Sequence, residues 1–404
     1  MQTPAPNTPK GLSLTQDAWR KLRRNRVAMV SLYVLGAVSL LALSTPLLPL
    51  QPPDRDQTSL QFEKPTASPF WLHDFDLDTE AIAATPDAVA ELEPKLAEAE
   101  TALASVDPAD EQAHSKARDA VRRLEAQIED TVQAPYREQG FANLGGLSRW
   151  MVRTRHSLFG DRSVNALCGR DLFGRDLFSR LFWGARTSLL VGLVATIVSL
   201  VIGVTYGAVS GYLGGWVDDA MMRAVDVLYS VPFVFVVIFI ITILGEESVA
   251  DRLARFGIDR VTVFFFVVGA IYWLTMARVV RGQVISLKTE PFVEAARSLG
   301  AGQARILFLH IVPNLFSVVI VYLTLTIPRV MLFEAFLSFL GLGVEPPEVS
   351  WGLLANQGIQ VITPVRFDWW LVVFPSIALG VTLTALNFLG DGLRDALDPR
   401  MRTQ

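Results

Sequence analysis

Long runs of apolar residues with almost no charge are the feature that most constrains how this chain folds. A helix needs about 20 such residues to cross the hydrocarbon core of a bilayer. Charged residues crowd into the stretches between the runs, which excludes a single soluble globule and a disordered chain. The sequence therefore predicts an all-α polytopic membrane protein, a bundle of six transmembrane helices. The runs are Val27–Leu50, Thr187–Trp216, Val227–Gly245, Val261–Ala277, Ile311–Pro328 with Val330–Phe333, and Trp369–Gly390.

Positive charges predict the orientation of the bundle, because short cytoplasmic segments are enriched in Lys and Arg. Basic clusters precede the first run, separate the fourth from the fifth, and follow the sixth. With six spans these three clusters share one side, so both termini are expected in the cytoplasm. The first run is longer than the apolar part of a cleaved signal and is expected to stay as an anchor. The clustered residues are Lys10, Arg20, Lys21, Arg23, Arg24, Arg26, Arg278, Arg281, Lys288, Arg297, Arg305, Arg394, Arg400 and Arg402.

A long polar segment between the first two runs sets the domain organisation. The expected parts are a cytoplasmic amino-terminal segment (1–26), a first transmembrane helix (27–50), an extracytoplasmic insertion (51–186), a core of five transmembrane helices (187–390) and a cytoplasmic tail (391–404).

The insertion contains a predicted helical hairpin over about 86–134. Apolar residues recur there at heptad-like spacing on both sides of a break at Val106-Asp107-Pro108. Pro94 is expected to start or kink the first helix. The hairpin is either a docking element for an extracytoplasmic partner or a solvated insertion, and both interpretations stay open. The repeating residues are Val89, Leu92, Leu96, Ala99, Leu103, Ala117, Val121, Leu124 and Ile128.

Common catalytic and ligand-binding patterns are missing from the sequence. A net charge of −4 gives no basic footprint for nucleic acid. The four histidines are scattered, so no metal site is expected. No phosphate-binding loop occurs, so the chain is not expected to hydrolyse ATP itself, nor to act as an enzyme. No acidic residue lies at the centre of a predicted span, whereas ion-driven carriers usually place one there.

Three functional classes are compatible with these observations. The chain is a subunit of a larger pump, a stand-alone secondary transporter or channel, or a membrane-anchored scaffold that acts through the outer hairpin. Arg329 is the one basic residue inside a predicted span. It either lines a pathway for anionic groups or extends to the outer interface, and the second interpretation is favoured.

The connection between the fourth and fifth runs contains a short predicted helix. Thr289 is the expected N-cap, Pro291 lies in the first turn, and Gly300 and Gly302 can end the helix. Phe292, Ala296 and Leu299 are predicted to share one face. Because about ten residues are too few for a stable isolated helix, this helix must pack against a partner or against the chain's own inner surface.

This connection resembles a known motif. Glu294-Ala295-Ala296, Gly300 and Val312-Pro313 are similar to the EAA loop in permease subunits of bacterial ABC importers. Further stretches resemble the dipeptide and oligopeptide branch of that family. They are Trp19–Val27, Gly174–Ser188, Glu334–Trp351, His310–Asn314 and Gly390–Arg400.

The resemblance implies a fold and a mechanism. The chain would be one permease in the bacterial plasma membrane, paired with a second homologous permease and surrounded by lipid. Two ATPase subunits would bind ATP and Mg²⁺ and drive alternating access, and an extracytoplasmic substrate-binding protein would deliver peptides or similar solutes. The implied ATPase-coupling loop spans about 288–310 and involves Glu294, Ala295, Ala296, Arg297, Leu299, Gly300 and Pro313. The implied outer re-entrant loop involves Glu334, Gly341, Gly343, Pro346 and Trp351.

Two features depart from that family. Gly169-Arg170-Asp171 stands where the family usually has Gly-Thr-Asp, so any role of the threonine does not carry over. The insertion before Gly169 is also much longer than in most dipeptide and oligopeptide permeases, so the resemblance implies the mechanism more directly than the solute.

Overall fold

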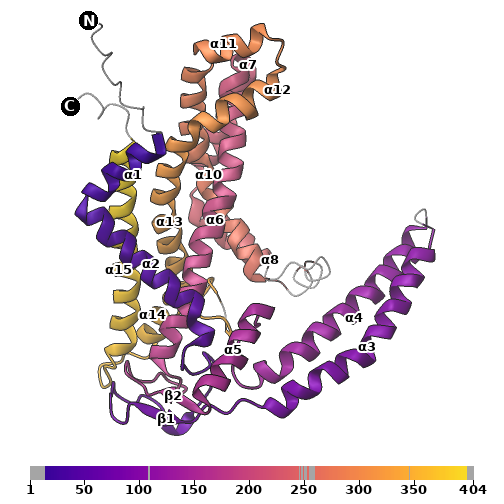
Figure 1. Ribbon diagram of the computed structural model, residues 1–404, viewed down its shortest axis with the longest axis vertical. Coiled ribbons are helices and arrows are strands. Elements are labelled where there is room, and N and C mark those ends of the chain that lie inside the picture. Colours follow the sequence, from indigo (N-terminus) through magenta and orange to yellow (C-terminus); the bar gives the residue numbers. More distant parts are fainter. Residues whose placement is uncertain are drawn as a thin grey trace, which may run out of the picture.

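The structure of the protein, a computed structural model, describes residues 14–107, 110–244, 246, 249, 253, 260–344 and 346–397. Residues 1–13 and 398–404 of the predicted terminal segments, and Glu345 of the predicted outer loop, lie outside this description. Long helices form an upright bundle, from which a helical hairpin projects (Figure 1). We call the end of the bundle with α11 (Pro291–Ser298) the α11 end, and the opposite end, with strands β1 and β2, the insertion end.

Among the described residues, five helices are long and apolar enough to cross a membrane, which confirms the predicted all-α bundle. A sixth span forms if α7 (Gly215–Ser230) and α8 (Phe233–Leu244) count together, although these two helices meet at 84°. The five are α2 (Arg26–Ser44), α6 (Leu177–Leu213), α10 (Arg260–Leu287), α13 (Phe316–Phe339) and α15 (Trp370–Leu397), some of them extended by short flanking turns.

The predicted third span, Val227–Gly245, is therefore not one straight helix. Its first residues belong to α7 and most of the rest belong to α8. Pro232 explains the break, because it has no N–H to donate and its ring disfavours helical geometry at the residue before it. Val231 accordingly adopts an extended conformation, with φ −85° and ψ 128°.

The helix of the predicted fourth span is also longer than expected. The apolar run ends at Ala277, but α10 continues to Leu287. Arg278 and Arg281, which the sequence placed in the connecting loop, therefore lie on a helix. Each of them pairs with an acidic residue of α7, so their charges are compensated beside the bundle.

Helices α6 and α10 form the tightest pair in the bundle. Three glycines of α6 at intervals of four residues, Gly203, Gly207 and Gly211, face α10. A Cβ atom on Gly207 would lie 2.3 Å from the carbonyl oxygen of Ala277, so the backbones approach closely only because no side chain intervenes. Small residues at every fourth position are typical of closely packed transmembrane helices.

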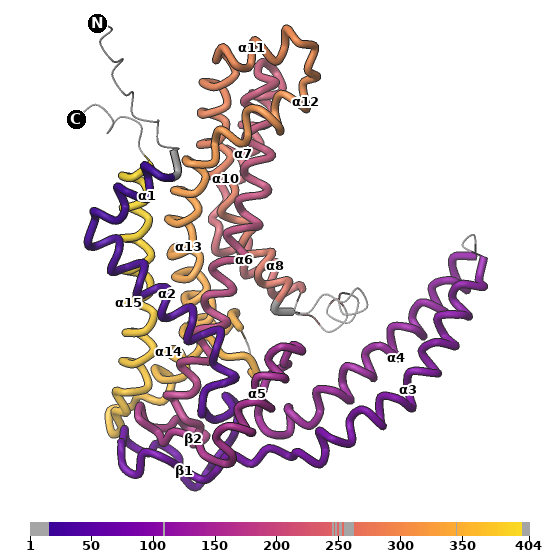
Figure 2. Tube along the Cα trace, in the orientation of Figure 1, coloured from indigo at the N-terminus to yellow at the C-terminus, as the bar shows by residue number. Residues whose placement is uncertain are grey.

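The spans α13, α2 and α15 lie to the left of this pair in Figure 2. Helix α13 packs against α6, α10, α15 and the short α14 (Trp351–Gln360). Helix α2 packs on α15 and α6 at the edge of the bundle. At the α11 end, α1 (Leu14–Arg24) contacts α15.

The insertion forms a small core of its own at the insertion end. Strands β1 (Trp71–His73) and β2 (Arg162–Val164) pair antiparallel, with Trp71 opposite Val164. Helix α5 (Gly146–Phe159) contributes Val152 to the core. Because Trp183 of α6 belongs to the same cluster, the insertion is fastened to the membrane bundle. The core residues are Phe75, Leu77, Ile82, Tyr136, Phe141, Leu144, Val152 and Trp183.

The hairpin consists of α3 (Thr79–Ser105) and α4 (Glu111–Arg137) and is longer than the predicted 86–134. Helix α3 starts at Thr79 because the Asp78 side chain accepts a hydrogen bond from the Ala81 N–H, at 2.8 Å. Pro94 does not start this helix but lies inside it. Pro94 is exposed, so water can bond the carbonyl group that loses its helical donor. Two short 3-10 turns, Thr45–Leu47 and Thr58–Leu60, complete the segment between α2 and β1.

Candidate functional site

The segment between α10 and α13 forms a cap at the α11 end. After α11 come the short α12 (Gln303–Arg305), a π-helical stretch (Ile306–Ile311) and a 3-10 turn (Val312–Leu315). Pro313 lies in that turn, well separated in sequence from the Glu294-Ala295-Ala296 triplet. The N-cap of α11 is Glu290 rather than the predicted Thr289, because the backbone turns helical only at Pro291.

Gly300 ends α11. Its φ of +80° is a left-handed conformation that favours glycine. This turn lets the N–H groups of Gly300 and Ala301 donate to the carbonyls of Arg297 and Ala296, which α11 itself leaves free. The same turn releases Leu299 from the helix, so its side chain is 88% exposed.

Only one face of α11 is packed against the protein. Val293 and Ala296 are buried in a cluster with Val284 of α10 and with Ile306 and Ile311. The predicted common face of Phe292, Ala296 and Leu299 is therefore wrong, since only Ala296 points inward.

The opposite face of α11 is open. Phe292 is 38% exposed, and Ala295 is exposed beside it. Within the part of the chain that the structure describes, Glu294 and Arg297 are exposed and form no ion pair. This face combines apolar side chains with unpaired charges of both signs, a surface suited to contact with another protein.

Beneath α11, partly buried polar contacts join α7 to α10. Asp218 of α7 accepts two hydrogen bonds from the Arg281 guanidinium, both at 2.6 Å, and one from Ser210 Oγ at 2.5 Å. A bidentate pair of this kind fixes orientation as well as distance. Lys288 donates to the carbonyl of Gly211 at 3.0 Å. Since α10 leads directly into α11, these contacts tie the base of α11 to α6 and α7.

A second polar pair lies farther along α7. Asp226 and Arg278 are 2.6 Å apart, and the Arg278 guanidinium lies 4.2 Å from the centre of the Tyr229 ring. Sequence reasoning missed both pairs, because it treated the arginines as loop charges. The four-residue spacing of the glycines in α6 was the available signal that α10 packs there.

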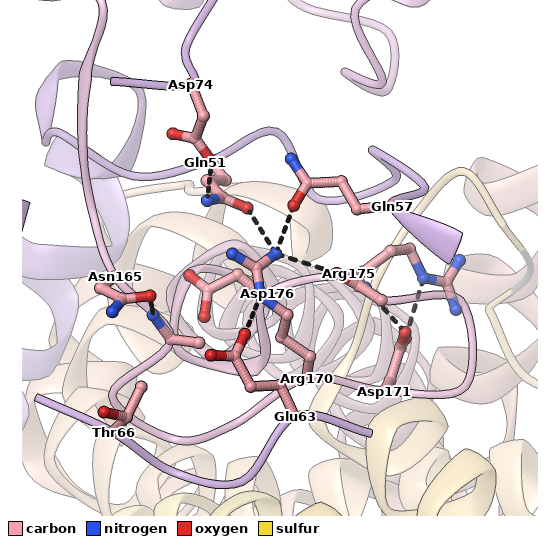
Figure 3. A network of polar contacts seen from close by, with 12 residues as sticks. Gln51, Gln57, Glu63, Thr66, Asp74, Asn165, Arg170, Asp171, Arg175 and Asp176 are labelled. Atoms are coloured by element: carbon pink, nitrogen blue, oxygen red, sulfur yellow. Dashed lines mark hydrogen bonds and ion pairs between the residues drawn. The ribbon is translucent and has the colours of Figure 1, made fainter. Parts of the chain in front are cut away.

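A buried network of charges lies at the insertion end, where the chain enters α6 (Figure 3). Arg170, the residue in place of the expected threonine, is fully buried. It donates to Glu63 at 3.0 Å, to Gln57 at 2.7 Å and to the carbonyl of Gly174 at 2.9 Å. Glu63 and Gln57 come before the hairpin in the sequence, so Arg170 joins the first part of the insertion to the segment that leads into α6.

The neighbouring charges extend this network. Asp171 pairs with Arg175 at 2.8 Å and with Arg180 at 2.5 Å. Arg180 also donates to Gln357 of α14 at 3.0 Å. Asp176 caps α6 by accepting from the Ser179 N–H at 2.9 Å, and burial raises the pKa of this carboxyl to about 6.

The predicted outer loop is held by buried polar contacts. Glu334 is not in the loop but on α13, where it accepts hydrogen bonds from Ser338 and Ser350, each at 2.7 Å. Trp351 begins α14, and its indole N–H donates to the carbonyl of Leu181 at 2.9 Å.

The other predicted loop residues are placed as follows. Gly341 follows the end of α13 with φ +76°. A Cβ atom on Gly343 would overlap Ser338, and Pro346 is exposed. Arg329 is exposed on α13, far from α11.

A helical bundle with several candidate membrane spans, and with a short exposed helix between two of them, defines a polytopic membrane protein. Residues 203–403 match the family model described as binding-protein-dependent transport system inner membrane component. Residues 13–66 match the model for the N-terminal TM domain of oligopeptide transport permease C. Residues 67–202, which contain the hairpin, lie outside both matches.

Individual relatives agree with these matches. The chain is 45% identical to the oligopeptide transport system permease protein OppC of Haemophilus influenzae, over 58% of this chain and 70% of that protein. It is 43% identical to the dipeptide transport system permease protein DppC of Bacillus subtilis, over 58% and 68%. It is 46% identical to OppC of Escherichia coli K12, over 58% and 72%. The chain belongs to the family of binding-protein-dependent transport permeases and is a permease subunit of an ABC importer.

Proposed function

We propose that this permease moves peptides or peptide-like solutes into the cell by alternating access. It would do so in a complex with a second homologous permease, two ATPase subunits and an extracytoplasmic substrate-binding protein. The relatives are named as oligopeptide and dipeptide permeases, which supports peptides as the solute. The ATPase subunits would bind ATP and Mg²⁺, since this chain has no phosphate-binding loop.

In this proposal the α11 end faces the cytoplasm and the insertion end faces outward. Helix α1 supports this orientation, because its last turn carries Lys21, Arg23 and Arg24 and it lies at the α11 end (Figure 1). The binding protein would then approach the insertion end, near α14.

The open face of α11 is the observation that carries the proposal. Its inner face is packed onto α10, while Phe292, Glu294, Arg297 and Leu299 are available to an ATPase subunit. A displacement of α11 would pass to α10, and from there to α7 through the Asp218–Arg281 pair.

Cysteine labelling tests orientation and contact together. In a Cys168→Ala background, Leu299→Cys is expected to be protected from a membrane-impermeant maleimide in intact cells. Val365→Cys, which is 98% exposed at the other end, is expected to be labelled. In the purified complex, Leu299→Cys should crosslink to an ATPase subunit and Val365→Cys should not. Labelling of Leu299→Cys from outside, or no crosslink from it, would refute the assignment.

A pair of glycine variants tests coupling. Gly300→Asp is expected to uncouple ATP hydrolysis from uptake while the complex still assembles, because Gly300 has a positive φ and closes α11. Gly302→Asp is the matched control. Gly302 has φ −67° and is the N-cap of α12, where Asp is a favoured residue. Equal uptake by the two variants would contradict the proposal.

A charge reversal tests the exposed carboxylate. Glu294→Lys is expected to uncouple ATP hydrolysis from uptake in the same way, with normal assembly with the partner permease.

Uptake by the purified chain in vesicles without ATPase subunits would instead support a stand-alone carrier. Loss of function only when the hairpin α3–α4 is removed would support the scaffold.

A further inference from the structure

A polar stripe runs along one face of α13 inside its membrane span. Tyr322, Thr326 and Arg329 are spaced i, i+4 and i+7, which places them on the same side of the helix. Tyr322 and Thr326 are half-buried, and Tyr322 also packs against the cluster that contains Val280 and Leu315, whereas Arg329 is exposed. The stripe is therefore open to a neighbouring molecule mainly at Arg329. The Thr326 hydroxyl donates to the carbonyl of Tyr322 at 2.6 Å and keeps its lone pairs free.

Arg329 has no acidic partner among the described residues. Glu334, the nearest acidic residue along α13, is buried and already bound to Ser338 and Ser350. The polar contact that the structure places at Arg329 is made by Tyr272 of α10, whose hydroxyl donates to the Arg329 carbonyl at 3.2 Å. The guanidinium is thus an uncompensated charge on the surface of a membrane helix.

The position of Arg329 disfavours an extension to the outer interface. It lies ten residues before Phe339, the end of α13, which corresponds to about 15 Å along the helix axis. Side chains on a helix incline toward its N-terminus. Helix α13 runs from the α11 end to the insertion end. The first bonds of the Arg329 side chain therefore point toward the α11 end and away from the outer surface.

The free face of α13 is also a poor candidate for contact with lipid. Helix α13 packs against α6, α10, α14 and α15, and Arg329 lies on the face that these contacts leave free. Charged side chains at membrane depth usually face a bundle interior or a water-filled path, because exposure to hydrocarbon is costly. Arg329 therefore faces the space between this chain and its neighbour in the complex.

We propose that Arg329 binds the terminal carboxylate of the peptide as it crosses the membrane. This inference rests on the proposed function, since a carboxylate at the carboxyl end is the acidic group that all unmodified peptides share. An arginine can hold a carboxylate with two parallel hydrogen bonds. The hydroxyls of Thr326 and Tyr322 continue the polar surface toward the α11 end, which is the direction of import.

The test compares a free peptide with its C-terminally amidated form. The complete importer is reconstituted in vesicles, the binding protein is loaded with either peptide beforehand, and a single round of uptake is measured. For Arg329→Gln we expect uptake of the free peptide to fall about tenfold, the effect of one lost hydrogen bond to a charged group. Uptake of the amidated peptide should stay within about twofold of the wild type. Arg329→Lys keeps the positive charge, so it should keep part of the wild-type preference for uptake of the free peptide over the amidated one.

A matched control and three outcomes separate the alternatives. Leu332→Gln places the same amide one turn farther along α13, at a side chain that is 58% exposed, and should leave the ratio of the two peptides unchanged. An equal loss for both peptides, or a complex that fails to assemble with Arg329→Gln, would show that Arg329 pairs with the second permease and would overturn the inference. No loss for either peptide would also overturn it. If the wild-type complex moves neither peptide, the proposed function itself fails.

Discussion

Replacing Gly207 by alanine is expected to destabilise the protein, because it adds a methyl group where α6 touches α10. The new carbon would lie 2.3 Å from the Ala277 carbonyl oxygen and 3.0 Å from two further backbone atoms of the same residue. Ordinary contacts begin near 3.4 Å, and backbone atoms cannot rotate aside. The two helices would therefore have to separate by roughly 1 Å, and gaps of that size forfeit a quarter to a half of the local dispersion energy.

Overpacking of this kind typically costs about 1–3 kcal/mol, and we expect the upper part of that range. The gain in helix propensity from Gly to Ala, up to about 1 kcal/mol, offsets some of the loss. The matched control is Gly282→Ala on α10, since nothing lies within 4 Å of the added carbon. That control should be neutral or slightly stabilising. Thermal unfolding of both variants in the same detergent measures the difference, and equal melting temperatures would refute the close α6–α10 contact.

Three further predictions follow from individual side chains. Asp218→Ala should lower the free energy of unfolding by about 2 kcal/mol, because it removes the charged hydrogen-bond partner of the partly exposed Arg281 guanidinium; a double-mutant cycle with Arg281→Ala measures the coupling, and additive effects would contradict the pair. Burial raises the pKa of Asp176 from 3.8 to about 6, so its protonated form stabilises the fold below about pH 4 and this contribution is lost as the pH rises through 6. Asn caps a helix as well as Asp does but has no charge to lose. The unfolding free energy of Asp176→Asn, relative to that of the wild type, should therefore rise by about 3 kcal/mol between pH 4 and pH 7. A difference between the two proteins that does not change with pH would count against this. Burial also raises the pKa of the Cys168 thiol to about 12, so a maleimide at pH 7 should label it only after denaturation; rapid labelling of the folded protein would show that the thiol is accessible.

The spans were predictable because length and hydropathy require no knowledge of tertiary contacts. The bend between α7 and α8 was signalled by Pro232, but its angle depends on what α8 packs against. The Asp218–Arg281 pair was not predictable, since the two residues are 63 positions apart and each resembles an ordinary charge at the end of a span. Arg170 was equally hidden, because its burial depends on Gln57 and Glu63 of the insertion.

The candidate site was predictable in identity but not in geometry. The resemblance located the residues around Glu294 in the sequence, whereas periodicity alone placed Leu299 beside Ala296. The structure separates these two residues, because α11 ends at Ser298 and the left-handed turn at Gly300 directs the chain away. Helical periodicity cannot be extended past the residue where the helix stops.

Helix α6 has a mechanical consequence that follows from its length. Its 37 residues correspond to about 55 Å, nearly twice the thickness of the hydrocarbon layer, and it contains no proline. The charged network around Asp176 is attached to one end of this rod, and the carboxylate of Asp218 is attached near the other through Ser210. A tilt of α6 that is imposed at one side of the membrane therefore also moves the end of α6 at the opposite side, because no bend interrupts the helix.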